Sequence, residues 1–153
     1  MKKIMMLLSV LVAACVSCTS VSTMSTPEGF AHFDKERNYR AVSADAVSIS
    51  SYVIESKSMQ EDNPLATWVK EADRVLVSKG YTALSINQIT LGNGLSGAYS
   101  EYEVMYNAEP WIYSSLVVKD NGRLIVTEVS GEKNIYLIRK EKILEAFKTI
   151  EVK

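Results

Sequence analysis

The segment between residues 81 and 130 constrains the fold most, because it contains four consecutive runs typical of β-strands. These runs are residues 81–91, 98–107, 111–119 and 123–130. Side chains in the second run alternate at a period of two, as in a strand with two different faces. Asn121-Gly122 lies between the last two runs, and both residues accept positive φ, which indicates a tight hairpin. We therefore expect consecutive antiparallel strands here.

Two further stretches have helical spacing. The first helix is expected over residues 64–79. Asn63 is suited to its N-cap, Pro64 to its first helical position and Gly80 to the left-handed residue that ends it. The second helix is expected over residues 132–150, where one apolar stripe contains Tyr136, Ile143, Phe147 and Ile150. Both helices therefore have one face suited to covering a sheet.

Three shorter strands are expected before the first helix, at residues 30–34, 39–43 and 47–56. A run of strands with one helix in the middle and one at the end is typical of an α+β fold. We predict a largely antiparallel sheet of about six or seven strands, covered on one face by the two helices.

The N-terminus has the layout of a cleaved export signal. Lys2 and Lys3 precede an apolar run over residues 4–14, which is shorter than the ~20 residues a membrane-spanning helix needs. Residues 11–15, Leu-Val-Ala-Ala-Cys, resemble the bacterial lipobox, in which the cysteine is diacylated and becomes the mature N-terminus. We predict a lipoprotein signal peptide at residues 1–14 and lipidation of Cys15. Cleavage before Cys18, or cleavage without a lipid, are the alternatives.

This reading places the protein in the cell envelope, anchored to the membrane and facing the periplasm. Valine rather than aspartate follows Cys15, which favours the outer membrane by analogy with enteric lipoproteins. Residues 15–28 are rich in serine and threonine and are expected to form a tether, followed by a single globular domain at residues 29–153. The only two cysteines are Cys15 and Cys18, so no disulfide is expected within that domain.

Net charge argues against a nucleic-acid partner. Loss of Lys2 and Lys3 leaves 15 of the 17 lysines and arginines against 18 acidic residues, a net charge of about −3. A nucleic-acid-binding protein would be expected to carry a basic patch.

A few residues mark the order of the elements. They are Pro27-Glu28-Gly29-Phe30-Ala31, the Asn63-Pro64 helix with Trp68, Gly80-Tyr81, and Ser130-Gly131-Glu132 before a helix closing on Lys148-Thr149-Ile150. In the order of its expected helices and strands, and in these residues, the chain resembles PsbP/DcrB-like domains of small exported proteins. The resemblance implies an envelope lipoprotein or extrinsic membrane-complex subunit, acting as a binding or accessory module without catalytic residues. It transfers no functional residue.

Three patterns could carry chemistry, and each has a simpler structural explanation. Residues 92–97 match the dinucleotide-binding pattern G-x-G-x-x-G, but a strand rather than a helix follows them, which indicates a hairpin loop. Glu101 and Glu103 share a strand face and could form a catalytic carboxylate pair, but such positions are usually solvated. His32 is the only histidine and is expected at a strand edge. We therefore expect no catalytic residue, metal site or cofactor.

The eight tyrosines are the remaining unusual feature. Tyrosine packs well between strands, and it is also enriched at protein interfaces. Packing in the sheet is therefore one explanation and a binding surface is another. We predict a candidate binding surface on the open face of the sheet, formed by Tyr99, Met105 and Tyr113.

Two main hypotheses for the function follow. The first is a lipid-anchored envelope protein that acts as a non-catalytic binding or accessory module for a protein partner. The alternative is a carrier of a small molecule or ion, with its pocket between sheet and helices. A degenerate enzyme or an inhibitor domain of similar shape is a third.

Overall fold

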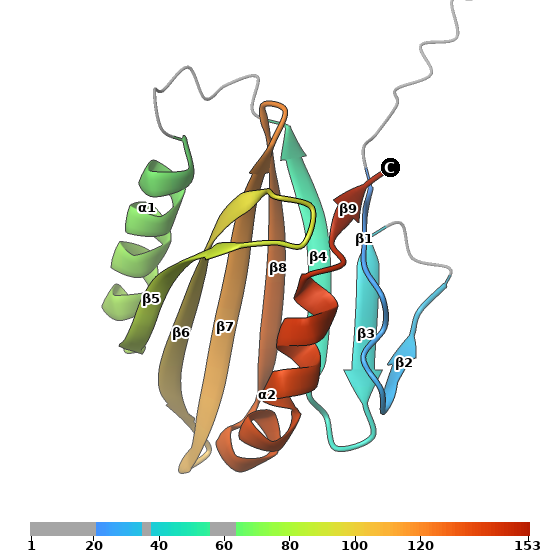
Figure 1. Cartoon of the computed structure of the whole chain (residues 1–153). Coiled ribbons are helices and arrows are strands. Elements are labelled where there is room, and N and C mark those ends of the chain that lie inside the picture. Colours follow the sequence, from blue (N-terminus) through green and yellow to red (C-terminus); the bar gives the residue numbers. More distant parts are fainter. Residues whose placement is uncertain (1–20, 35–37, 56–63) are drawn as a thin grey trace, which may run out of the picture.

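The computed structural model describes residues 21–34, 38–55 and 64–153. Within them, seven strands form one sheet, in which every neighbouring pair is antiparallel, in the order β2-β3-β4-β8-β7-β6-β5 (Figure 1). The strands are β2 (Phe30–His32), β3 (Tyr39–Ser43), β4 (Ser48–Glu55), β5 (Thr82–Thr90), β6 (Ser96–Tyr106), β7 (Glu109–Asp120) and β8 (Arg123–Glu132). The helices are α1 (Pro64–Ser78) and α2 (Lys133–Phe147). The predicted α+β fold class is confirmed.

Tight turns join the central strands where the sequence predicts them. In the β7–β8 hairpin, Asp120 pairs with Arg123 across Asn121 (φ 44°) and Gly122 (φ 76°). Positive φ at both central residues matches the twist of the two strands. Residues 91–95 connect β5 to β6, so the G-x-G-x-x-G pattern is part of a hairpin, as expected.

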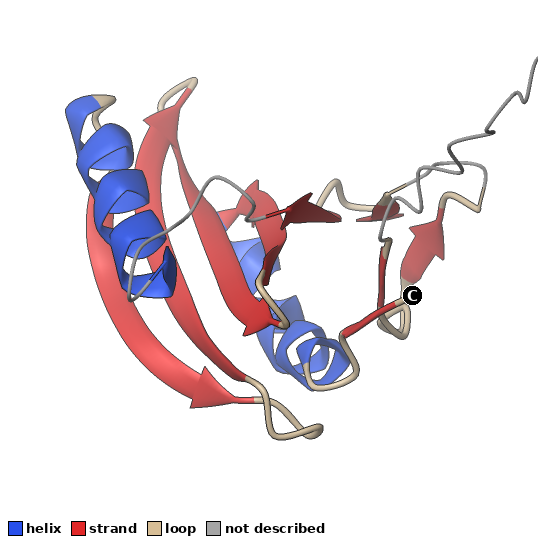
Figure 2. Cartoon of the chain, turned by 90° about the horizontal axis from the view of Figure 1, so that it is seen from above, coloured by secondary structure: helices blue, strands red, loops and turns tan. Residues whose placement is uncertain are grey.

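The two helices lie on opposite faces of the sheet (Figure 2), which corrects the prediction that both cover one face. On β7, Leu116 and Val118 belong to the core under α2, whereas Val117 packs on the side of α1 with Trp68. The reason is that β7 and β8 are apolar at consecutive positions, residues 116–118 and 124–126, and all six side chains are buried. Strands of this kind need cover on both faces.

The helices differ in how deeply they are packed. α2 buries four side chains, those of Tyr136, Ile143, Ala146 and Phe147. In α1, every described side chain from residue 65 to residue 78 is half-buried or exposed. The C-terminal end of α1 is well defined, because Gly80 has φ 91° and the Tyr81 N–H donates to the Leu76 carbonyl over 3.1 Å. α1 is therefore a defined but loosely packed helix.

The chain folds earlier than the predicted tether allows. Strand β1 (Ser22–Thr23) pairs with the C-terminal strand β9 (Glu151–Val152), and Met24 is only 9% exposed. The Ser22 hydroxyl donates to Ser51 of β4 over 2.8 Å. Residues 21–28 thus belong to the folded domain, because their short polar side chains find partners on β4 and β9. The predicted signal peptide, Cys15 and Cys18 lie outside the described residues.

No helix among the described residues is both long enough and apolar enough to cross a membrane.

Candidate functional site

The three residues of the predicted binding surface do not lie together. Tyr99 is buried beneath α2, Tyr113 faces α1, and Met105 is 62% exposed near the end of β6. Tyr113 pairs with Tyr102, whose side chain points to the opposite face from Tyr99. The predicted surface is wrong because helices cover both faces of the sheet and because the register separates the two tyrosines.

Beneath α2, Glu101 is the centre of a closed hydrogen-bond network. The Tyr99 and Tyr136 hydroxyls lie 2.9 and 3.0 Å from its Oε1 atom and 2.6 Å from each other. The Lys140 ammonium group donates to Oε2 over 2.8 Å. Burial alone would raise the pKa of Glu101, but the bonds from Lys140 and both tyrosines outweigh burial and lower that pKa below 4.5. Glu101 is therefore a buried, ionised structural group and not the solvated residue that the sequence suggested.

The other candidates for chemistry are separate from this network. Glu103 forms an ion pair with Lys133 on the same side of the sheet, so each glutamate has its own cation. His32 lies on the outer strand β2, as expected, where it stacks on Tyr39 with ring centroids 4.8 Å apart and pairs with Asp34 at 2.8 Å. Among the described residues, no group of three or more His, Cys, Asp or Glu side chains is placed to hold a metal ion.

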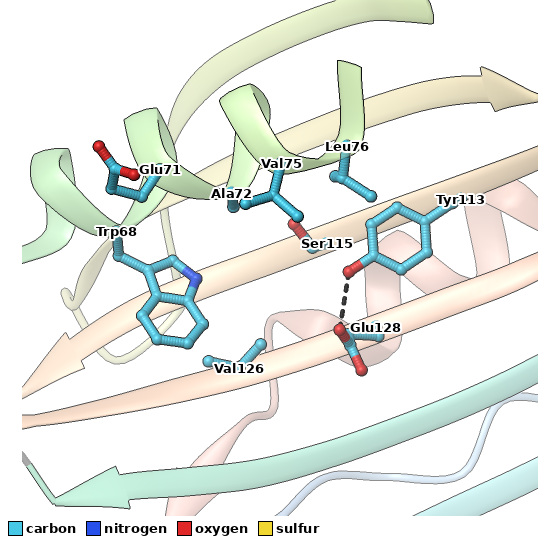
Figure 3. A pocket seen from close by; sticks show the side chains of 9 residues that line it. All are labelled: Trp68, Glu71, Ala72, Val75, Leu76, Tyr113, Ser115, Val126 and Glu128. Carbon is cyan, nitrogen blue, oxygen red and sulfur yellow. Dashed lines mark hydrogen bonds between the residues drawn. The ribbon is translucent and has the colours of Figure 1, made fainter. Parts of the chain in front are cut away.

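On the opposite face, a groove of about 310 Å³ lies between α1 and strands β7 and β8. We call it the α1 groove. Its cause is a mismatch in side-chain size: Ala72 and Ser115 are small, whereas the large rings of Trp68 and Tyr113 lie on either side of Ser115 (Figure 3). The nine lining residues are Trp68, Glu71, Ala72, Val75, Leu76, Tyr113, Ser115, Val126 and Glu128.

The Tyr113 hydroxyl donates a 2.7 Å hydrogen bond to Glu128 Oε1 across the floor of the groove (Figure 3). Burial, reinforced by this carboxylate, raises the pKa of Tyr113 far above 10. Burial and the same carboxylate raise the pKa of Tyr52 to about 12. Both phenols therefore stay neutral at physiological pH.

Further tyrosines support this wall of the groove. Tyr81 meets Tyr113 edge to face, with ring centroids 6.0 Å apart, and Tyr102 lies 6.3 Å from the same ring. The Tyr102 hydroxyl donates to Asp73 of α1 over 3.0 Å, which ties the helix to β6. The ring of Tyr113 is thus held by its neighbours and oriented by Glu128.

A second hollow, of about 540 Å³, lies on the other side of α1 against β5 and β6. Its lining includes Leu65, Val69, Lys70 and Ile86, but no aromatic ring and no carboxylate. The α1 groove is the better candidate site, because it combines apolar walls with a few oriented polar groups.

Of the residues that line this groove, Tyr113 was predicted to bind a partner, but as part of a different surface. Trp68 was noted only as a marker of the first helix, and Glu128 was missed. The available signal was alternation in β8, since Leu124, Val126 and Glu128 share one face, on which a charged residue follows two apolar ones. A charged side chain at such a position is expected to have a specific partner or role.

No protein-family model and no curated protein matches this sequence. Solved structures, however, share its fold. LpqN of Mycobacterium tuberculosis, involved in cell envelope biogenesis, matches with a TM-score of 0.62 and 12% identity, over 88% of this chain and 84% of LpqN. The cyanobacterial PsbP protein of Synechocystis matches with a TM-score of 0.57 and 15% identity, over 88% of this chain and 93% of that protein.

A Pseudomonas aeruginosa protein of unknown function, described as a putative regulator, matches with a TM-score of 0.54 and 11% identity, over 84% of this chain and 81% of its own. At these identities the likeness concerns the fold alone. The chain therefore has a PsbP-like fold, in agreement with the resemblance noted in the sequence.

Proposed function

We propose that this protein is a lipid-anchored, non-catalytic binding module of the cell envelope, and that the α1 groove is its binding site. The observation that carries the proposal is the groove itself, with apolar walls from α1 and an oriented carboxylate on its floor. The lipobox-like residues 11–15 support the anchor, and the fold shared with an envelope-biogenesis protein is consistent with an accessory role.

The packing of the two helices favours this face over the other. Beneath α2, the polar groups around Glu101 satisfy one another, and α2 itself buries four side chains. Beneath α1, the floor is partly open and no described helix residue is fully buried. A ligand can therefore enter beneath α1 without disrupting a closed core.

Two kinds of occupant fit this groove. The first is a side chain or short segment of a protein partner, as expected for an accessory module. The second is a small molecule, which would make the protein a carrier. A volume of about 310 Å³ favours a small occupant, because it lies at the lower end of the roughly 300–1,000 Å³ typical of ligand sites.

Site-directed crosslinking in intact envelopes tests the proposed site. A photoreactive residue is placed at Val75, on the rim of the groove, and in a matched protein at Ile138, which is 81% exposed on α2. We expect a defined crosslinked product from position 75 and not from position 138. Combining position 75 with Ala72→Phe, which fills the groove, should abolish the product while leaving the melting temperature nearly unchanged. A product of equal yield from both positions, or one that persists after filling, would refute the site.

Lipidation is tested separately. Membrane fractionation and mass spectrometry of the full chain should show that Cys15→Ser releases the protein from the membrane fraction and removes the acyl mass. Cys18→Ser should change neither result. If only Cys18→Ser has these effects, the anchor is at Cys18; if neither variant does, the proposed anchor is wrong.

A further inference from the structure

The lining of the α1 groove is selective for charge. Its nine residues include two carboxylates, Glu71 and Glu128, and no lysine, arginine or histidine. The remaining lining side chains are neutral. An anion entering this groove would lose its hydration without meeting a counter-charge, whereas a cation would meet one.

Glu128 is the carboxylate available to an occupant. Glu71 forms an ion pair with Arg74 on α1, at 2.8 Å, and its side chain points away from the strands (Figure 3). Glu128 is half-buried on β8 and interacts with two phenol hydroxyls, those of Tyr113 and Tyr52, and the ion pairs among the described residues do not include it. A carboxylate in such a place is stabilised by a cationic partner that brings its own hydrogen-bond donors.

The two aromatic rings of the groove favour a cation as well. Trp68 and Tyr113 lie on either side of the small Ser115 side chain, with Glu128 beside Tyr113 (Figure 3). The faces of indole and phenol rings attract cations, and indole does so most strongly. Val126 and Leu76 supply apolar surface nearby for the carbon chain of an occupant.

We propose that the α1 groove binds an organic cation, an ammonium group on a short apolar chain, with the nitrogen at Glu128 and the chain between Trp68 and Val126. This inference rests on the proposed function and names the chemistry of its ligand. Two sources share that chemistry, a free small amine and the lysine side chain of a protein partner.

Nuclear magnetic resonance titration of the purified full chain in mild detergent tests the proposal. The probes are n-butylammonium, the neutral n-butanol and the anionic butyrate. The two tryptophans provide the readout and its internal control, because Trp68 lines the groove, whereas Trp111, two residues from Tyr113 on β7, does not line it and packs against Tyr106. We expect n-butylammonium to shift the indole N–H signal of Trp68 but not that of Trp111, and to bind at least tenfold more tightly than butanol or butyrate.

Two variants locate the charge that is responsible. Glu128→Gln keeps an acceptor for Tyr113 but removes the charge, and it should weaken n-butylammonium binding by about tenfold to a hundredfold. Glu141→Gln removes the same charge from an exposed position on α2 and should change the affinity less than twofold. Equal weakening by both variants would mean general electrostatic attraction and would overturn the proposal.

The remaining outcomes separate this inference from the proposed function. If butanol or butyrate shifts Trp68 as strongly as n-butylammonium, the groove binds ligands but is not selective for cations, so only the inference fails. If no probe binds while position 75 still crosslinks, the inference fails and the binding module stands. A blocked Gly-Lys-Gly peptide that binds more tightly than n-butylammonium would identify a lysine side chain as the source, and the reverse order would identify a free amine.

Discussion

Glu101 and Glu103 stand two residues apart on β6, yet their environments differ, and replacing each with alanine measures that difference. Glu101 is 9% exposed and receives hydrogen bonds from Tyr99, Tyr136 and Lys140. Glu103 has one described ion-pair partner, Lys133, and both side chains of that pair are partly open to water, at 28% and 38% exposure. The two substitutions remove the same atoms, so their effects can be compared directly.

The expected magnitudes follow from the partners left behind. After Glu101→Ala, Tyr99 and Tyr136 still bond each other, and Tyr136 keeps Ser114 at 3.0 Å. The main loss is the charge-assisted bonds at Glu101, together with a half-buried Lys140 that has lost its counter-charge. We expect destabilisation by about 3 kcal/mol. For Glu103→Ala we expect about 0.5 kcal/mol, because a partly exposed pair contributes little.

Urea denaturation followed by far-ultraviolet circular dichroism gives both free energies of unfolding at pH 7. The denaturant dependence should be the same in all three proteins, which shows that the two-state comparison is valid. A loss below about 1 kcal/mol for Glu101→Ala, or one no greater than that of Glu103→Ala, would refute the account of the network as a stabilising structural unit.

Three further predictions follow from the fold. Because the pKa of Glu101 is lowered in the folded state, its contribution to stability is present above pH 4.5 and is lost as pH falls through the lowered pKa. The difference in unfolding free energy between the protein and its Glu101→Gln variant should therefore shrink in acid. Urea denaturation from pH 7 to pH 3 measures this difference. Gly97→Ala would place a Cβ atom 2.8 Å from the Val117 carbonyl oxygen, so it should destabilise the protein by about 1–3 kcal/mol in thermal unfolding, whereas Ser96→Ala on the exposed neighbour should change little. Amide hydrogen exchange should be faster in α1 than in α2, because α1 buries no described side chain completely, and equal protection of the two helices would contradict this.

Features with a local cause were predictable from the sequence. The β7–β8 hairpin and the end of α1 depend on positive φ at Asn121, Gly122 and Gly80, and few residue types tolerate that conformation, so it is visible in the sequence. Alternation likewise identified β6. The placement of the helices was mispredicted because it depends on which faces of β7 and β8 need cover. The consecutive apolar residues at 116–118 and 124–126 carried that signal.

Features with a long-range cause were not predictable. β1 and β9 are two residues each and pair across nearly the whole chain, so neither strand has a pattern of its own. The α1 groove arises where Ala72 of α1 meets Ser115 of β7, and no sequence window contains both. Trp68 and Tyr113 could be singled out by residue type, but their position on either side of a gap follows only from the packing of α1 on the sheet.

In the proposed anchored form, the pairing of β1 with β9 would limit how far the domain can move from the membrane. If folding began at residue 29, a chain anchored at Cys15 could reach about 45 Å at full extension. Because Val21 already belongs to the fold, with its N–H donating to the Lys153 carbonyl, at most residues 15–20 can separate such an anchor from the domain, and the reach is at most about 20 Å. A domain on so short a connection stays within one protein diameter of the lipid headgroups. In the proposed anchored form, it could meet only ligands or partners that themselves come to the membrane surface.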